Sequence, residues 1–174
     1  MTDYSRATGL LQILRPDGTW DKKREPSIPE KTLLRMYHSM ALLRAADERG
    51  ITLQRQGRIS FYGAATGQEA AVIGSAAALR DDDWVFPALR EAGVLLYRGF
   101  PLDKYMAQLF GSRDDILKGR QMPCHYGSKE HGFVALSSPI GTQIPQAVGA
   151  AMAAKYLQDG RGVVGYMGDG AASE

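Results

Sequence analysis

The chain has 174 residues, a length that fits one domain or part of one. A hydrophobic fraction of 44% and a charged fraction of 23% exclude a disordered chain and a collagen-like repeat. Lys and Arg number 21 against 19 Asp and Glu, which leaves a net charge of only +2, and no long basic block stands out. Nucleic acid and anionic membranes are therefore not expected as main partners.

The cysteine content and the N-terminal residues together predict the compartment. Cys124 is the single cysteine, so an internal disulfide is excluded, as is usual in a reducing compartment. The first residues, MTDYSR, lack the charged-then-apolar order of a secretory signal, and they are not the Arg-rich amphipathic stretch of a mitochondrial presequence. We therefore expect a cytoplasmic protein.

The first part of the chain predicts an irregular arm over residues 1–29, which contains a short strand at 10–14. The S-x-x-E pattern at 27–30 is typical of a helix capping box. A long helix is expected over 28–56 and should end at Gly57, because one helical stripe is mostly apolar. The members of this stripe are Leu33, Tyr37, Met40, Leu43 and Asp47.

The rest of the chain predicts a mixture of helices and strands. Strands are expected at 84–86 and 161–167, and Gly74 is expected to be a point of close helix packing. The expected helices lie over 67–79, 90–98, 101–110 and 144–158, with a last one from Ala171 onward. This order predicts an α/β fold, a parallel sheet flanked by helices, of which residues 30–174 form only the front part.

The most informative motif is an apolar strand followed at once by Gly168, Asp169, Gly170 and a helix start. Open α/β sheets bind ligands at the carboxyl ends of their strands. Glycines there let backbone N–H groups face a diphosphate. Asp169 would repel phosphate unless a divalent cation lay between them, and Mg²⁺ suits such oxygen ligands best. The alternative is a tight strand–helix turn that Asp169 caps.

Three further features each allow two interpretations. The polar, proline-bracketed loop before the helix at 144–158 either holds a monovalent cation or is a capped turn. Arg90 either binds a phosphate or lies on the surface. Cys124 and His125 do not form a nucleophile and its base in an extended segment, because neighbouring side chains then point to opposite faces. His125 therefore either packs in the core or faces a site alone.

Six segments in matching order resemble the alpha subunits of the decarboxylating component of 2-oxo acid dehydrogenase complexes. The similarity is greatest to the branched-chain 2-oxo acid members. The segments are 54–62, 67–70, 90–93, 118–123, 137–149 and 168–174. They cover nearly everything from about residue 30 onward, so the resemblance implies that residues 30–174 are the front part of a thiamine diphosphate-binding dehydrogenase domain.

The resemblance also implies the roles of individual residues. The residues that would contact thiamine diphosphate are Arg90, Ser138, Ile140, Gly168, Gly170 and Ala171. Asp169 would bind Mg²⁺. A potassium ion would be held by Ser137, Pro139, Thr142 and Gln143. Phe61 and His125 would border the substrate. No catalytic residue is expected within this chain, because the family places one on a beta subunit and others further downstream.

The activity that the resemblance implies is oxidative decarboxylation of branched-chain 2-oxo acids such as 3-methyl-2-oxobutanoate. The acyl group would pass to a lipoyl group on a partner acyltransferase, and two alpha and two beta subunits would assemble. Leu89 stands where many relatives have tyrosine, which puts the polarity of the pocket in doubt. The family's metal-binding asparagine is absent, so we expect a truncated chain that by itself binds cofactor poorly and is inactive. The alternatives are a pyruvate- or acetoin-type enzyme and a non-catalytic interaction fragment.

Overall fold

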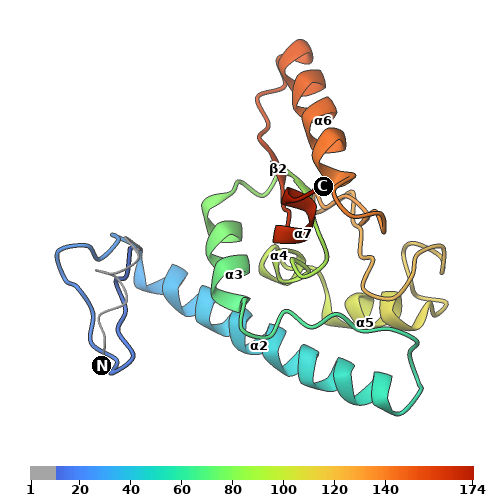
Figure 1. The fold of residues 1–174 in the computed structure, drawn as a ribbon, viewed down its shortest axis with the longest axis horizontal. Coiled ribbons are helices and arrows are strands. Elements are labelled where there is room, and N and C mark those ends of the chain that lie inside the picture. The colour runs from blue at the N-terminus through green and yellow to red at the C-terminus, as the bar shows by residue number, and fades with distance from the viewer. Residues whose placement is uncertain (1–10) are drawn as a thin grey trace. The chain divides into compact units, whose positions relative to one another are not determined.

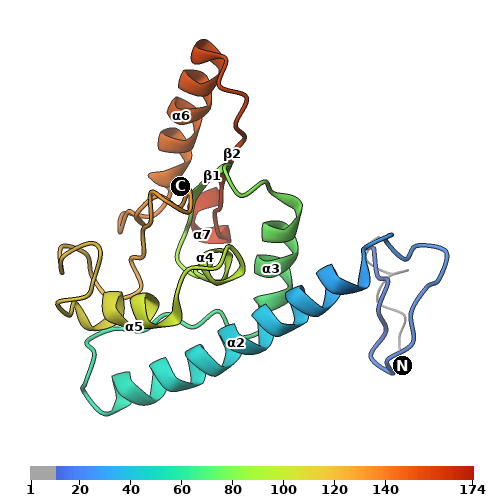
Figure 2. The same ribbon diagram turned by 180° about the vertical axis from the view of Figure 1, so that it is seen from behind.

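The computed structural model of the chain describes residues 11–174. The chain divides into two compact units, Met1–Leu33 and Leu34–Glu174, and the arm predicted over residues 1–29 falls within the first. Figures 1 and 2 show the helices and strands of the chain from opposite sides. Within residues 11–174, no helix combines the length and the apolar character that a membrane crossing requires.

In the first unit, a turn reverses the chain between Arg15 and Thr19. The Arg15 N–H donates to the Thr19 carbonyl at 2.8 Å, and Gly18 takes a φ of +81°, which glycine adopts without strain. The turn brings Leu14 beside Trp20 in a single antiparallel bridge. In the described part of the chain, the strand predicted over 10–14 is therefore reduced to this bridge; residue 10 itself lies outside the described residues.

Helix α2 spans Glu30–Arg55 and confirms the long helix predicted from the sequence. The capping box predicted at 27–30 does not form, because Glu30 is the first residue of the helix rather than the third. The helix ends as predicted at Gly57, which has a φ of +69° and whose N–H closes the last turn.

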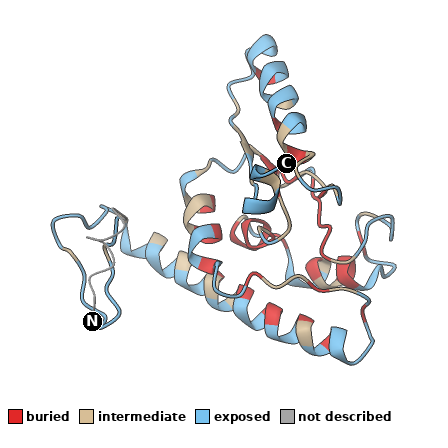
Figure 3. Ribbon diagram, viewed as in Figure 1, coloured by how far each residue is buried: buried red, intermediate tan, exposed pale blue. Residues whose placement is uncertain are grey.

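The core of the second unit is built around α3 (Glu69–Ala78) and α4 (Gly93–Tyr97), which pack against each other. Every residue of α4 is buried, as Figure 3 shows. The packing is closest at Gly93, where a Cβ would stand 2.7 Å from the Leu43 side chain of α2. A Cβ on Gly74 would meet nothing within 4 Å, so the close contact predicted there is wrong and Gly93 provides it instead.

Only part of the apolar stripe predicted for α2 is buried. The side chains of Leu43 and Asp47 are each 1% exposed, whereas Tyr37 is 70% exposed and Leu33 is 47% exposed. The predicted stripe is therefore a buried face only in its later turns. Helical periodicity identifies a face, but the other elements of the fold decide how much of that face they cover.

The sheet consists of two parallel strands, β1 (Trp84–Phe86) and β2 (Val163–Gly165), with Trp84 aligned to Val163. Helix α6 (Gln143–Leu157) packs against both strands. The strand predicted at 84–86 is confirmed, and its partner is shorter than predicted because β1 offers only three residues to pair with. This small parallel sheet among helices confirms the predicted α/β class.

Two short helices complete the second unit. Helix α5 (Leu102–Phe110) starts directly after Pro101, as predicted. Helix α7 (Asp169–Ala172) begins before Ala171, the predicted start, and its N-cap is Gly168 rather than the aspartate. Asp169 therefore lies in the first turn of α7, close to the end of β2.

Candidate functional site

A cavity of about 530 Å³ lies in the second unit, at the carboxyl end of β2. It brings together most of the site residues predicted from the sequence: Phe61, His125, Ser137, Ser138, Ile140, Gln143, Gly168, Asp169, Gly170 and Ala171. These residues come from four separate parts of the chain. Three predicted residues, Arg90, Pro139 and Thr142, do not line the cavity.

Two of the glycines on the cavity wall, Gly168 and Gly170, are not needed by the fold of the described chain. A Cβ on Gly168 or on Gly170 would meet nothing within 4 Å, and neither residue has a left-handed φ. In contrast, Gly93 is required by packing. Glycine at 168 and 170 instead leaves the backbone open toward the cavity, which suits a ligand that approaches the main chain closely.

Asp169 supplies the negative charge of the cavity. Its side chain is exposed, and within residues 11–174 its carboxylate forms no hydrogen bond or ion pair. The same residues contain no group of three His, Cys, Asp or Glu side chains that could hold a metal ion. Asp169 can therefore provide one ligand to a cation whose other ligands come from elsewhere, such as water or phosphate.

Oxygen atoms converge in the loop before α6. The Thr142 Oγ1 lies 2.7 Å from Ser137 Oγ and 2.8 Å from the Pro139 carbonyl oxygen. Hydroxyl and carbonyl oxygens of this kind are the ligands that hard cations prefer. Gln143 is bound differently, because its Nε2 donates to the Tyr166 carbonyl at 2.7 Å and ties the start of α6 to the residue after β2.

His125 faces the cavity and not Cys124. Its Nε2 lies 2.7 Å from Ser138 Oγ, and its Nδ1 lies 3.0 Å from the Pro123 carbonyl oxygen. The Cys124 sulfur accepts a hydrogen bond from the Gly63 N–H at 3.3 Å, and burial raises the pKa of this thiol to about 11. Neither ring nitrogen of His125 is hydrogen-bonded to Cys124, and Cys124 has a left-handed φ of +64° rather than the expected extended backbone.

Arg90 lies away from the cavity wall, although its neighbour Leu89 is part of that wall. The Arg90 side chain is exposed, and its Nη1 donates to the Ala64 carbonyl. The Nε and Nη2 groups of Arg90 form no hydrogen bond to the described residues, so they remain available to an anion. Its predicted role stays a prediction.

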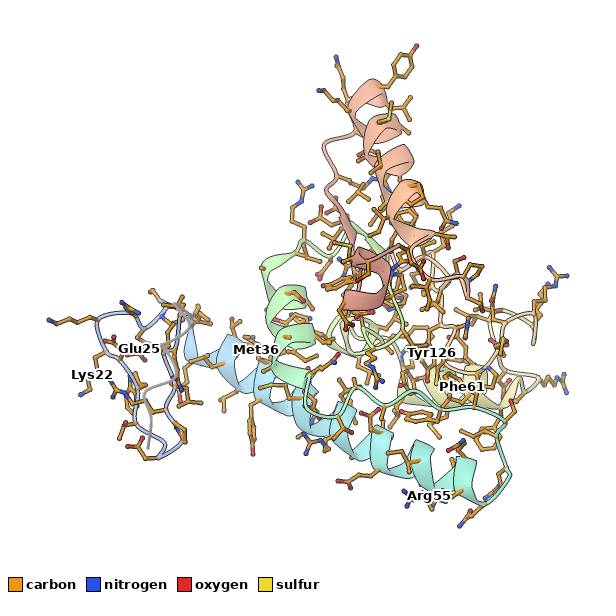
Figure 4. All side chains as sticks on the ribbon, in the orientation of Figure 1. Lys22, Glu25, Met36, Arg55, Phe61 and Tyr126 are labelled. Atoms are coloured by element: carbon orange, nitrogen blue, oxygen red, sulfur yellow. The ribbon has the colours of Figure 1, made fainter. Side chains whose placement is uncertain are left out.

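Phe61 reaches the cavity because a buried carboxylate holds the segment that follows it. Figure 4 labels Phe61 on the segment that follows α2. The Tyr62 hydroxyl donates to Asp47 Oδ1 at 2.8 Å, and the Ala65 N–H donates to Asp47 Oδ2 at 2.8 Å. The Thr66 hydroxyl donates to the same Oδ2 at 3.2 Å. Asp47 was expected only as a member of a helical stripe, and its spacing in the sequence carried no sign of this anchoring role.

The structure also adds wall residues that the motifs did not identify. Ala88 follows β1, Leu136 precedes the polar loop, and Gly141 lies within that loop. Each lies a few residues from a predicted site residue. Proximity to the motifs was therefore the one signal that could have found them.

Comparison with known proteins identifies the family. Residues 37–174 match the family model described as dehydrogenase E1 component. The chain belongs to this family. Members of the E1 component family generally use thiamine diphosphate, and the open glycine backbone of the cavity is compatible with a diphosphate.

Among curated relatives, the mitochondrial 2-oxoisovalerate dehydrogenase subunits alpha of Bos taurus and Homo sapiens are each 52% identical over 163 residues. These matches cover 94% of this chain but only 34% and 35% of the two relatives. Subunit alpha 1 from Arabidopsis thaliana is 49% identical over 84% of this chain and 31% of its own length. The chain thus spans about a third of the length of the curated relatives it matches.

The expected cytoplasmic location is wrong. The mammalian and plant relatives are all named as mitochondrial proteins, which contradicts that expectation. The expectation rested on the absence of a presequence pattern in the first residues, and those residues did not identify the compartment.

Proposed function

We propose that this chain forms part of the alpha subunit of a thiamine diphosphate-dependent dehydrogenase that acts on branched-chain 2-oxo acids such as 3-methyl-2-oxobutanoate. The observation that carries the proposal is the cavity in which Gly168 and Gly170, which the packing does not require, lie beside the Asp169 carboxylate, which has no partner within residues 11–174. Membership of the E1 component family and the names of the 2-oxoisovalerate dehydrogenase relatives support the same activity.

In this proposal, the wall around α7 holds the cofactor. Gly168, Gly170 and Ala171 bind the diphosphate, and Asp169 binds the Mg²⁺ that neutralises it. Ser138 and Ile140, on the opposite loop of the wall, contact the rest of the cofactor; the same role is proposed for Arg90 through the guanidinium donors that do not bind Ala64.

A potassium ion is proposed to order the loop before α6. The Thr142 hydroxyl lies within hydrogen-bond distance of both the Ser137 hydroxyl and the Pro139 carbonyl oxygen, which supports three neighbouring oxygen ligands for a cation. Gln143 completes the set through the oxygen of its side-chain amide, while its nitrogen binds the Tyr166 carbonyl. By binding Pro139 between Ser138 and Ile140, and Ser137 beside them, the ion would hold Ser138 and Ile140 at the cavity wall.

The substrate is proposed to lie between the cofactor and the side chains of Phe61 and His125. Phe61, Leu89 and Leu136 give this wall an apolar character that suits a branched alkyl group. When bound, the cofactor supplies the electron sink for loss of carbon dioxide. The chain's own residues bind and orient the reactants and exclude water, while the catalytic groups are expected elsewhere in the assembly.

The proposed partners are a beta subunit, in an assembly of two alpha and two beta chains, and a lipoyl-bearing acyltransferase. The test is a comparison of 3-methyl-2-oxobutanoate, pyruvate and acetoin as substrates of the complete native complex, with lipoyl acyltransferase as acceptor. We expect the branched-chain acid to give the highest kcat/KM. A preference for pyruvate or acetoin would assign the protein to another member of the family.

A further inference from the structure

The hydrogen bonds of His125 determine which of its ring nitrogens carries the proton. A carbonyl oxygen only accepts hydrogen bonds, so the Nδ1 that lies 3.0 Å from the Pro123 carbonyl must carry a hydrogen. In the neutral ring, Nε2 is then a lone-pair acceptor. When the ring is neutral, Ser138 Oγ, 2.7 Å away, therefore donates its proton to Nε2.

The Ser138 hydroxyl has one competing acceptor within the described chain, the sulfur of Met122 at 3.9 Å. A thioether sulfur is a weak acceptor, and this distance is long, whereas the imidazole nitrogen lies at an ordinary hydrogen-bond distance. The imidazole therefore takes the proton. His125 is only 7% exposed, which keeps the ring in place.

Ser138 itself is exposed on the cavity wall. With its proton directed to His125, its oxygen offers only lone pairs to the cavity. A ligand oxyanion would be repelled there, whereas an amino N–H or a hydroxyl would be bound. This division agrees with the rest of the wall, where open backbone at Gly168 and Gly170 is the part suited to a diphosphate.

We propose that His125 is a positioning residue that holds the Ser138 hydroxyl as a hydrogen-bond acceptor toward the cavity, so that this wall selects the amino or hydroxyl donor of a bound ligand. The inference rests on the proposed function where it takes that ligand to be thiamine diphosphate. His125 acts through Ser138 and needs no direct contact with the reacting atoms.

The test is a double-mutant cycle on the complete native protein, read out as the Kd of thiamine diphosphate by isothermal titration calorimetry. His125→Leu removes the acceptor, and His125→Gln keeps a side-chain oxygen that can accept from Ser138. We expect His125→Leu and Ser138→Ala each to raise Kd about fivefold, the value of one hydrogen bond. His125→Leu should add almost nothing in the Ser138→Ala background, and His125→Gln should remain within about twofold of wild type.

Additive effects of the two substitutions, or a Gln variant as weak as the Leu variant, would overturn the proposal. Failure of the wild-type protein to bind thiamine diphosphate would instead overturn the proposed function and, with it, the ligand assigned here. A second measurement does not depend on folded variants at position 125. The ¹⁵N chemical shifts of His125 in the native protein should report the Nδ1–H tautomer, and the Nε2–H tautomer would refute the inference.

Discussion

The ring of Tyr62 lies directly over Gly50 of α2. A Cβ on Gly50 would stand 2.3 Å from the Tyr62 Cζ atom, far inside any permitted contact. This close approach lets the Tyr62 hydroxyl reach Asp47, one turn earlier on the same helix. The segment that carries Phe61 to the cavity therefore depends on a residue without a side chain in the middle of a helix.

Gly50→Ala should destabilise the protein although alanine favours helix. The added methyl group must displace the buried Tyr62 ring, at a cost of about 1–3 kcal/mol, which exceeds the gain of about 1 kcal/mol in helix propensity. Gly74→Ala is the matched control in α3, because its Cβ would meet nothing. It should stabilise by about 0.5–1 kcal/mol. Urea denaturation gives the change in unfolding free energy for both variants. Changes of the same sign for the two variants would contradict the prediction.

Asp47→Leu should lower the free energy of unfolding by about 2–4 kcal/mol, because the buried donors of Tyr62 and Ala65 lose their acceptor. Asp47→Asn should cost less. Burial raises the pKa of Asp47, so the charge is disfavoured in the folded protein, and Asn still offers one oxygen. Denaturant titration of the two variants gives the comparison. A loss for Asn as large as the loss for Leu would contradict a stabilising role for the acceptor oxygen that Asn retains.

Glu69→Gln should change how stability depends on pH. The Arg44 Nε donates to Glu69 Oε1 at 2.5 Å and holds the pKa of Glu69 below its usual 4.5. A lowered folded-state pKa stabilises the protein fully above about pH 4.5, and this stabilisation is lost as pH falls through the lower value. Wild type should exceed Glu69→Gln in unfolding free energy at pH 7, and this advantage should shrink as pH falls below about 4.5. The exposed Glu130→Gln controls for loss of one charge, and a pH-independent difference would contradict the prediction.

Gly170→Val should weaken thiamine diphosphate binding by about tenfold or more without lowering the thermal unfolding midpoint, because valine is no worse than glycine in a helix. A Cβ at this position meets nothing within 4 Å in the described chain, but the residue lines the cavity where a ligand would approach the backbone. Gly149→Val in α6 is the control, since its Cβ also meets nothing and it does not line the cavity. Calorimetric titration with thiamine diphosphate should show weaker binding by the Gly170→Val variant than by the Gly149→Val variant of the complete protein. Equal affinities of the two variants would contradict the proposal that Gly170 leaves the backbone open to the diphosphate.

Asp169→Asn should weaken thiamine diphosphate binding by about tenfold in the presence of Mg²⁺. The variant and the wild type should bind alike when EDTA removes the metal, because the carboxylate acts through the cation. Titrations with and without Mg²⁺ measure this difference. If the Asp169→Asn variant bound as tightly as wild type in Mg²⁺, the assignment of Asp169 as a metal ligand would be wrong.

Much of the local structure was predictable because its signals lie within a few residues of one another. The end of α2 at Gly57 follows from glycine's access to a left-handed φ. The strand at 84–86 follows from an apolar run stopped by proline, whereas the turn expected from Gly168 to Gly170 is replaced by the start of α7 at Asp169. The family resemblance then pointed to residues that the cavity does bring together, such as Ser138 and Asp169.

The helical segments, the parallel strand pair and the motif at the end of a strand could be predicted from the sequence, because periodicity and backbone preference act over short distances along the chain. Three relationships became visible only in the folded structure: the close contact at Gly93 rather than Gly74, the bond from Arg90 to the Ala64 carbonyl, and the bond between His125 and Ser138. Those relationships join segments that are separated in the sequence, and they are set by which atoms the fold brings within a few ångströms.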